Sequence, residues 1–403
     1  MRLVARALPI AMLLFALVPF VRPRSAGTVP LYAARQGLMC QSCHFDPNGG
    51  GPRNDFGFAY ARNRHALEAD TSEAWKDLAV MNRLGENVPV YLGVNQRFML
   101  LANAIAKSDS LERLGFFNMQ NALHFAFQPH QRLALVYTAD AFSEGGTSGR
   151  FASKDAFGLV SGFPLDGYLK AGRFRTPFGL RMDDHTVATR NSFLDFQTGQ
   201  TFLPYDPRSP DMGVEYGTSQ GSLFGRLALT NGGASVFGGQ FAETKTLKVG
   251  YNNAWYQGAV SLYDNYQKES FSSRRRATRW GYYGIGHYRK LALLGEIAAG
   301  TDEAITGEKT NLLAGFAEAD YALSRAWNLR LRFDRLEADR SSDRIVREQN
   351  TYQRYALEGE YVPVPFAELR WVARVVDPRA DKDPFGNELK SEKQAYLQMH
   401  FSY

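Results

Sequence analysis

The sequence FNMQNALHFAFQ, from Phe117 to Gln128, alternates between apolar and polar side chains. In an extended strand, successive side chains point to opposite faces. One face of this strand is predicted to carry Phe117, Met119, Leu123, Phe125 and Phe127, and the other Asn118, Gln120, His124 and Gln128. One face suits lipid and the other suits water, which is the pattern of a strand in a membrane-spanning β-barrel.

The same alternation of apolar and polar residues recurs in segments of about ten residues from Val90 to Tyr403, and Gly, Asn, Asp and Ser separate the segments. At the end of the chain, Ala395, Leu397, Met399, Phe401 and Tyr403 alternate with Gln394, Tyr396, Gln398, His400 and Ser402. A terminal aromatic residue is typical of the last strand of outer-membrane barrels. Further strands are predicted at Tyr91–Ala102, Leu133–Ala141, Tyr168–Phe174, Leu223–Thr230, Trp255–Tyr263, Trp280–Tyr288, Leu291–Ala299, Leu312–Leu323, Asn328–Leu336, Tyr352–Val362 and Phe366–Val376, with weaker ones within Ser143–Gly162 and Asp211–Tyr251.

The predicted fold class is therefore all-β, an outer-membrane antiparallel barrel over residues 89–403. We expect roughly 14 to 18 strands, and about 16 fits best because bacterial barrels close on an even number. An aromatic content of 13 % fits girdles at both membrane boundaries. A soluble sandwich or propeller is the alternative, but the chain shows no internal repeat of the kind that propellers carry.

A second motif stands before the barrel, at Cys40-Gln41-Ser42-Cys43-His44. It holds both cysteines of the chain in the Cys-x-x-Cys-His spacing that attaches a c-type haem. A thioredoxin-like pair would need a following helix, but a turn-rich loop, Phe45–Gly51, follows here. A zinc site would need a distant fourth ligand such as His65, and a disulfide leaves His44 unexplained. We predict one covalent haem c, with Cys40 and Cys43 as thioether anchors and His44 as the proximal iron ligand.

The N-terminal part divides into a secretory signal, residues 1–27, and a monohaem segment, residues 28–88. Arg2 and Arg6 precede an uncharged apolar run from Leu8 to Val21, which is typical of an export signal; a retained N-terminal anchor is the alternative. Helices are predicted at Asp55–Ala69 and Thr71–Leu84. About 60 residues make a small core, so the haem would serve as its apolar centre and the segment would plug the barrel.

The second axial ligand stays open between several residues. His65 lies within reach in the same segment, Met81 is the alternative, and the lumen-facing His124 would tie the haem to the barrel wall. The sixth position can also be open, which would permit peroxidase chemistry. Methionine ligation raises the reduction potential, whereas two imidazoles leave it lower.

The chain resembles the fused outer-membrane monohaem cytochrome-porins of iron-oxidising bacteria. The resemblance rests on Tyr32-Ala33-Ala34-Arg35-Gln36-Gly37 before the motif and Asn54-Asp55-Phe56-Gly57-Phe58-Ala59-Tyr60 after it. The glycine loop Asn48–Gly51 departs from the family pattern. The resemblance implies a haem-bearing plug, an outer membrane of a Gram-negative bacterium and Fe(II) as electron donor. A further segment, Gly172–Arg181, resembles a part of anion-selective porins in which arginines crowd a constriction.

The predicted function is electron transfer between an extracellular donor or acceptor, such as Fe(II), and a periplasmic cytochrome or other carrier. No pattern supplies a catalytic base or nucleophile, so an electron carrier is favoured over a metabolic enzyme. An anion or small-solute porin with a structural or regulatory haem plug is the alternative, and a soluble periplasmic oxidoreductase is a third possibility. Asp46 and Asp55 could attract a cation, and Arg274-Arg275-Arg276 with Arg279 could meet outer-membrane lipid. The net charge of +6 does not imply nucleic acid.

Overall fold

The computed structural model describes residues 32, 36, 38–68, 83–85, 88–105, 112–141, 151–182, 184, 186–190, 210–232, 241–268, 274–303, 306–383, 386 and 388–403. Sixteen antiparallel strands form a closed barrel in which each strand pairs with its neighbours in sequence and β1 pairs with β16. The fold and the strand number predicted from the sequence are confirmed. The strands are β1 Val90–Ile105, β2 Glu112–His130, β3 Leu133–Ala141, β4 Phe151–Phe163, β5 Gly167–Phe174, β6 Asp211–Gln220, β7 Leu223–Thr230, β8 Thr244–Asn252, β9 Tyr256–Lys268, β10 Arg274–Tyr288, β11 Leu291–Glu303, β12 Lys309–Ala322, β13 Trp327–Glu337, β14 Thr351–Val364, β15 Ala367–Pro378 and β16 Glu392–Ser402.

The two faces of the wall differ in polarity, as the alternation predicts. On β13, Leu331 is 58 % exposed on the outer surface, whereas its neighbours Arg330 and Arg332 are buried in the lumen. On β16, Leu397 and Phe401 are exposed while Gln394 and Gln398 are buried. The outer face is therefore apolar, as contact with lipid requires. Every wall strand is also paired on both sides, so the backbone N–H and C=O groups form hydrogen bonds without water.

A β-bulge in the first strand pair changes one predicted face. The register between β1 and β2 shifts between Arg97 and Phe98, so Met99 pairs with Phe117. Phe117 and Met119 consequently pack beside the buried Met99 and Tyr396, whereas Leu123 and Phe125 keep their exposed positions. The assignment of Phe117 and Met119 to the same face as Leu123 was wrong, because one extra residue in a strand inverts the alternation beyond it.

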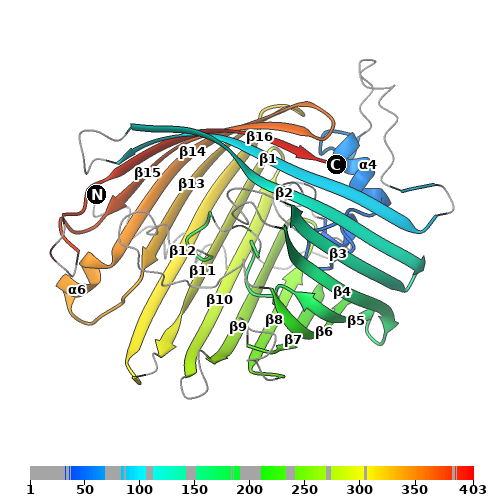
Figure 1. Ribbon diagram of the computed structural model, residues 1–403, viewed down its shortest axis with the longest axis horizontal. Helices are drawn as coiled ribbons and strands as arrows, with labels where there is room; N and C mark the ends of the chain where they lie inside the picture. Colours follow the sequence, from blue (N-terminus) through cyan, green and yellow to red (C-terminus); the bar gives the residue numbers. More distant parts are fainter. Residues whose placement is uncertain are drawn as a thin grey trace.

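The barrel has a short-turn end and a long-loop end. At the short-turn end, brief turns join strand pairs, as between β2 and β3 or β10 and β11, and β1 begins and β16 ends there. At the long-loop end lies the connection between β13 and β14, which contains α6, Arg344–Gln349. Figure 1 shows α4 and the C-terminus together at one end and α6 at the opposite end. Exposed Trp255, Tyr288 and Trp327 mark the short-turn end, where aromatic girdles are expected.

The segment before the barrel contributes two short helices, α3 Cys40–Cys43 and α4 Asp55–Arg62. The second is shorter than the predicted Asp55–Ala69, because Arg64 and His65 adopt left-handed backbone angles (φ 54° and 58°) that end the helix. The predicted helix at Thr71–Leu84 falls mostly outside the described residues, and the predicted signal at 1–27 lies wholly outside them.

No helix in the described part of the chain is both long enough and apolar enough to cross a bilayer.

Candidate functional site: the CxxCH segment in the barrel lumen

The Cys-x-x-Cys-His motif forms a single helical turn, α3. The backbone N–H of His44 donates to the carbonyl oxygen of Cys40 at 2.9 Å, and the N–H of Asn54 donates to the carbonyl of Cys43 at 3.0 Å. Both cysteine side chains are partly exposed. This turn places the thiols one helical turn apart with the His44 imidazole directly after them, as haem attachment requires.

Burial raises the pKa of the Cys43 thiol, and the nearby Arg53 guanidinium opposes the rise. A raised pKa disfavours the thiolate on which a zinc site or a dithiol redox centre depends. Among the described residues, no group of three or more His, Cys, Asp and Glu side chains is arranged to hold a metal ion.

Helix α4 packs directly against this turn. The side chain of Asn54 caps its first turn by accepting from the N–H of Gly57 at 2.9 Å. Gly57 touches α3 so closely that a Cβ at this position would lie 2.0 Å from the carbonyl oxygen of Cys43. The motif and the helix thus form one unit whose contact requires glycine.

His65 returns to the motif after α4 ends. Its N–H donates to the carbonyl of Tyr60 at 3.0 Å, and its imidazole stacks on the Tyr32 ring with centroids 3.8 Å apart. The two consecutive left-handed residues, Arg64 and His65, reverse the chain at this point. Non-glycine residues adopt this conformation at a cost, and such positions concentrate at functional sites.

Cys40, Cys43, His44 and His65 line one cavity of about 110 Å³. Cofactor pockets usually measure roughly 300 to 1,000 Å³, so this cavity would have to widen to take a haem. Two thiols and two imidazoles are nevertheless the donor set that a six-coordinate haem c uses. The donor chemistry of the lining residues therefore fits a haem. Glu368 and His400 of the barrel wall close the cavity on another side.

The other two candidate ligands are not brought to this cavity by the described structure. Met81 lies outside the described residues. His124 lies on β2 with its Nδ1 3.2 Å from the Thr138 hydroxyl oxygen, so its imidazole is engaged with the wall.

A buried lysine fixes the loop after the motif to the wall. Lys170 Nζ on β5 is fully buried and lies 3.2 Å from Asp46 Oδ1 and 3.1 Å from Glu215 Oε2. Asn48 donates to the Glu215 carboxylate at 2.9 Å. Asp46 therefore pairs with lysine inside the lumen, and the idea that it attracts a dissolved cation was wrong. Asp55 is exposed, in an ion pair with Arg83.

The last strand holds the other side of the same segment. Arg53 donates to the Ser402 carbonyl at 2.7 Å and to its hydroxyl at 3.1 Å. Phe58 stacks on Phe366 at 5.2 Å and meets the Tyr403 ring edge-on at 5.6 Å. We call residues 38–68 the plug. It is anchored to β5 and β6 on one side and to β16 on the other, and the sequence alone gave no sign of these partners.

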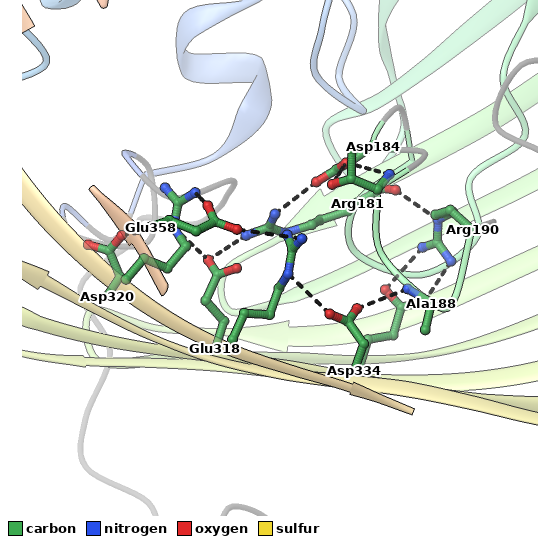
Figure 2. Close-up of polar contacts among 12 residues, drawn as sticks. Arg181, Asp184, Ala188, Arg190, Glu318, Asp320, Asp334 and Glu358 are labelled. Atoms are coloured by element: carbon green, nitrogen blue, oxygen red, sulfur yellow. Dashed lines mark hydrogen bonds and ion pairs between the residues drawn. The ribbon is translucent and has the colours of Figure 1, made fainter. Parts of the chain in front are cut away.

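A second segment, residues 175–182, 184 and 186–190 after β5, also enters the lumen; we call it the inward segment. Arg181 pairs with Asp184 at 2.8 Å and with Glu318 of β12, and Ala188 N–H donates to Asp334 of β13 at 3.0 Å. Figure 2 shows these contacts within a network of alternating cations and carboxylates. Arg190, fully buried, pairs with Glu296 of β11 at 2.8 Å. The segment therefore reaches the wall formed by β11 to β13 from its origin on β5.

The predicted basic cluster is divided between the two faces of the wall. Arg279 is buried in the lumen, where it pairs with Asp302 at 2.6 Å, so its assignment to a lipid-facing cluster was wrong. Arg276 is partly exposed and pairs with Asp264 at 3.0 Å. Alternation along β10 separates the two arginines.

The sequence matches no protein-family model and no curated protein. Solved structures with a similar fold are outer-membrane channels. The anion-selective porin from Comamonas acidovorans aligns with a TM-score of 0.58 at 10 % identity, over 78 % of this chain and 99 % of that one. The channel DcaP of Acinetobacter baumannii gives 0.55 at 13 %, over 78 % and 97 %. OmpF of Salmonella typhi gives 0.52 at 9 %, over 78 % and 97 %.

These likenesses concern the fold, and the outer surface of the barrel supplies the location. A closed barrel whose exterior carries exposed Leu, Val, Phe and Trp side chains is stable only in lipid. The chain is an antiparallel sixteen-stranded barrel of porin type, located in the outer membrane of a Gram-negative bacterium.

Proposed function

We propose that this barrel carries one covalent haem c in its lumen and passes electrons between an extracellular donor or acceptor and a periplasmic carrier. The observation that carries the proposal is the single cavity shared by Cys40, Cys43, His44 and His65 inside a membrane-spanning barrel. The resemblance of residues 32–60 to cytochrome-porins supports the same conclusion, with Fe(II) as one candidate donor.

Each residue of the site has a distinct part in this proposal. Cys40 and Cys43 would hold the haem through thioether bonds, and His44 and His65 would supply imidazole ligands to its iron. When bound, the haem supplies a reversible one-electron change of its iron. Tyr32 stacks on the His65 ring and orients it, and the contacts of Phe58 with Phe366 and Tyr403 hold α4 against the barrel wall.

The position of the plug suggests at which end of the barrel each redox partner would bind. In bacterial barrels the short turns face the periplasm and the longer loops face the exterior. The plug lies against the ends of β1, β15 and β16 at the short-turn end, next to the periplasm. A periplasmic cytochrome or other carrier would meet α4 there, whereas an external donor would enter through the long-loop end. The barrel thereby brings a redox centre within an insulating layer about 30 Å thick.

The test uses mature protein purified from outer membranes in detergent. The mass should exceed that of the polypeptide by one haem, and the visible spectrum should be that of a low-spin c-type cytochrome that Fe(II) or another external reductant reduces. His65→Ala should give a high-spin spectrum and His65→Met a higher reduction potential. His130→Ala, in an exposed turn, is the matched control and should leave both unchanged. A polypeptide of unmodified mass would refute the proposal.

A second candidate, an anion or small-solute porin with the plug as a structural or regulatory part, is favoured by the channel folds that resemble this chain. Ion-selective conductance in planar bilayers that does not change with the oxidation state of the protein would support it. A protein that conducts nothing and exchanges electrons with external reagents would support the first proposal instead.

A further inference from the structure

Two cations face each other across neighbouring strands of the lumen wall. Arg226 of β7 stands directly opposite Lys248 of β8 in the strand register. They are only 5 % and 7 % exposed. Like charges directly opposite each other on paired strands repel, and burial removes the water that would screen them. Such a pair lowers stability unless negative charge lies beside it.

The protein contacts of the two side chains are uncharged. Lys248 Nζ contacts the Met182 sulfur at 3.8 Å. The Arg226 guanidinium donates to the carbonyl oxygens of Thr218 and Gly225, both at 2.9 Å. Over the part of the chain that the structure describes, neither cation forms an ion pair with a carboxylate.

The nearby carboxylates contact other cations. Glu215 shares the fully buried Lys170 with Asp46, and Glu296 pairs with Arg190. In the strand register, the next lumen position beyond Lys248 is Ser261 on β9, and the one beyond Arg226 is Gly217 on β6, both without charge. Three carboxylates thus stand against four cations, which leaves an excess of one positive charge among these described residues.

Lys248 and Arg226 line a cavity of about 40 Å³ between the plug and the inward segment. The plug contributes Cys40 and Asn48 to its walls, and the inward segment contributes Gly179 and Met182. None of the described residues that line it is acidic. A buried site with two cations and no carboxylate in its lining has the chemistry of an anion site, and this volume suffices for a small ion.

We propose that Arg226 and Lys248 bind a small inorganic anion, such as chloride, nitrate or phosphate, in this cavity. A carboxylate of the haem is the wrong occupant, because Cys40 lies at this cavity. Thioether bonds form at the vinyl edge of a porphyrin, and its two carboxylates lie on the opposite edge. The proposal concerns the barrel wall, so it stands or falls independently of the haem.

The test compares thermal unfolding of the full-length mature protein in detergent with chloride, phosphate or the bulky anion gluconate, at equal ionic strength. Binding to the folded state should raise the unfolding midpoint by about 2 to 4 °C in chloride or phosphate relative to gluconate. Lys248→Met should abolish this difference. Lys245→Met, on the exposed face of the same strand, is the matched control and should retain it.

Bromide soaked into crystals of the unaltered protein gives a second measurement that needs no variant. An anomalous peak between Arg226 and Lys248 is the expected result. Bromide peaks confined to exposed lysines, an unfolding midpoint that is the same in all three anions, or an equal anion-dependent rise in Lys248→Met would each overturn the proposal.

Discussion

Gly57 decides whether α4 of the plug can lie against the Cys-x-x-Cys-His turn, α3. A methyl group there would approach the Cys43 carbonyl oxygen to 2.0 Å, and the obstacle is backbone, which cannot rotate aside. Since α3 and α4 touch at this point, any relief must separate them. The separation would carry His65 away from the cavity that it shares with His44.

We therefore expect Gly57→Ala to lower the ratio of haem to polypeptide, while the barrel itself still forms. Haem absorbance per polypeptide measures the first, and the mobility difference between heated and unheated samples in gel electrophoresis measures the second. Gly115→Ala is the control, because a methyl group at that strand position meets nothing within 4 Å. Equal haem content in wild type and Gly57→Ala would show that the close contact is not needed.

At the same scale, a motif can be recognised in a sequence, whereas a contact between distant residues cannot. Cys40, Cys43 and His44 could be predicted as a haem-attachment site because their spacing is specific to that chemistry, and this stays a prediction. The pairing of Asp46 with Lys170 was not, because an isolated acidic residue in a turn-rich loop has the same local pattern whether it meets water or a buried lysine.

At the scale of the elements, the attachment of the plug to β5 and β6 depends more on Lys170 than on either of the two carboxylates that Lys170 contacts. Lys170 lies between Asp46 and Glu215, so its removal leaves two buried carboxylates facing each other. Removal of the Asp46 charge leaves the pair of Lys170 with Glu215 intact. Burial also raises the pKa of Asp46, so its ionised form is held at a cost.

Lys170→Met should accordingly weaken the plug's attachment by about 3 to 5 kcal/mol, the usual cost of breaking a buried ion pair. Asp46→Asn should have a much smaller effect. Hydrogen exchange of residues 38–68 at neutral pH measures both, with the strands as internal reference. Similar exchange in the two variants would mean that the lysine is not the main anchor.

The strands were predictable because alternation repeats over many segments, but the bulge between β1 and β2 was not. One extra residue inverts the alternation without leaving a compositional trace, and Phe117 and Met119 were placed on the wrong face for this reason. The inward segment was also missed as an element. It lacks a period of its own, and its position depends on partners such as Glu296 and Asp334, which are distant in sequence.

At the scale of the whole molecule, an apolar belt of outward-facing strand residues should contact lipid. Two exposed apolar side chains, one inside this belt and one outside it, should therefore respond differently to substitution. Leu331 is 58 % exposed in the middle part of β13, and Ile345 is 69 % exposed on α6 at the long-loop end. Leu331→Arg should lower the free energy of unfolding in lipid by about 2 to 4 kcal/mol, as a charge near the bilayer midplane does. Ile345→Arg should change it little.

Unfolding by guanidinium in phospholipid vesicles measures both variants. Equal effects would place the apolar belt elsewhere on the barrel. The sequence predicted this belt well, because the two-faced strands follow from alternation alone. It did not predict how the lumen is filled, since that depends on contacts between residues hundreds of positions apart, such as Arg53 with Ser402.

The contact of Arg53 with Ser402 couples two features that are far apart in sequence. The plug rests against the final strand, and that strand also forms the seam with β1. A substitution in β16 that weakens the seam would therefore also disturb the seat of the plug, so the two should loosen together.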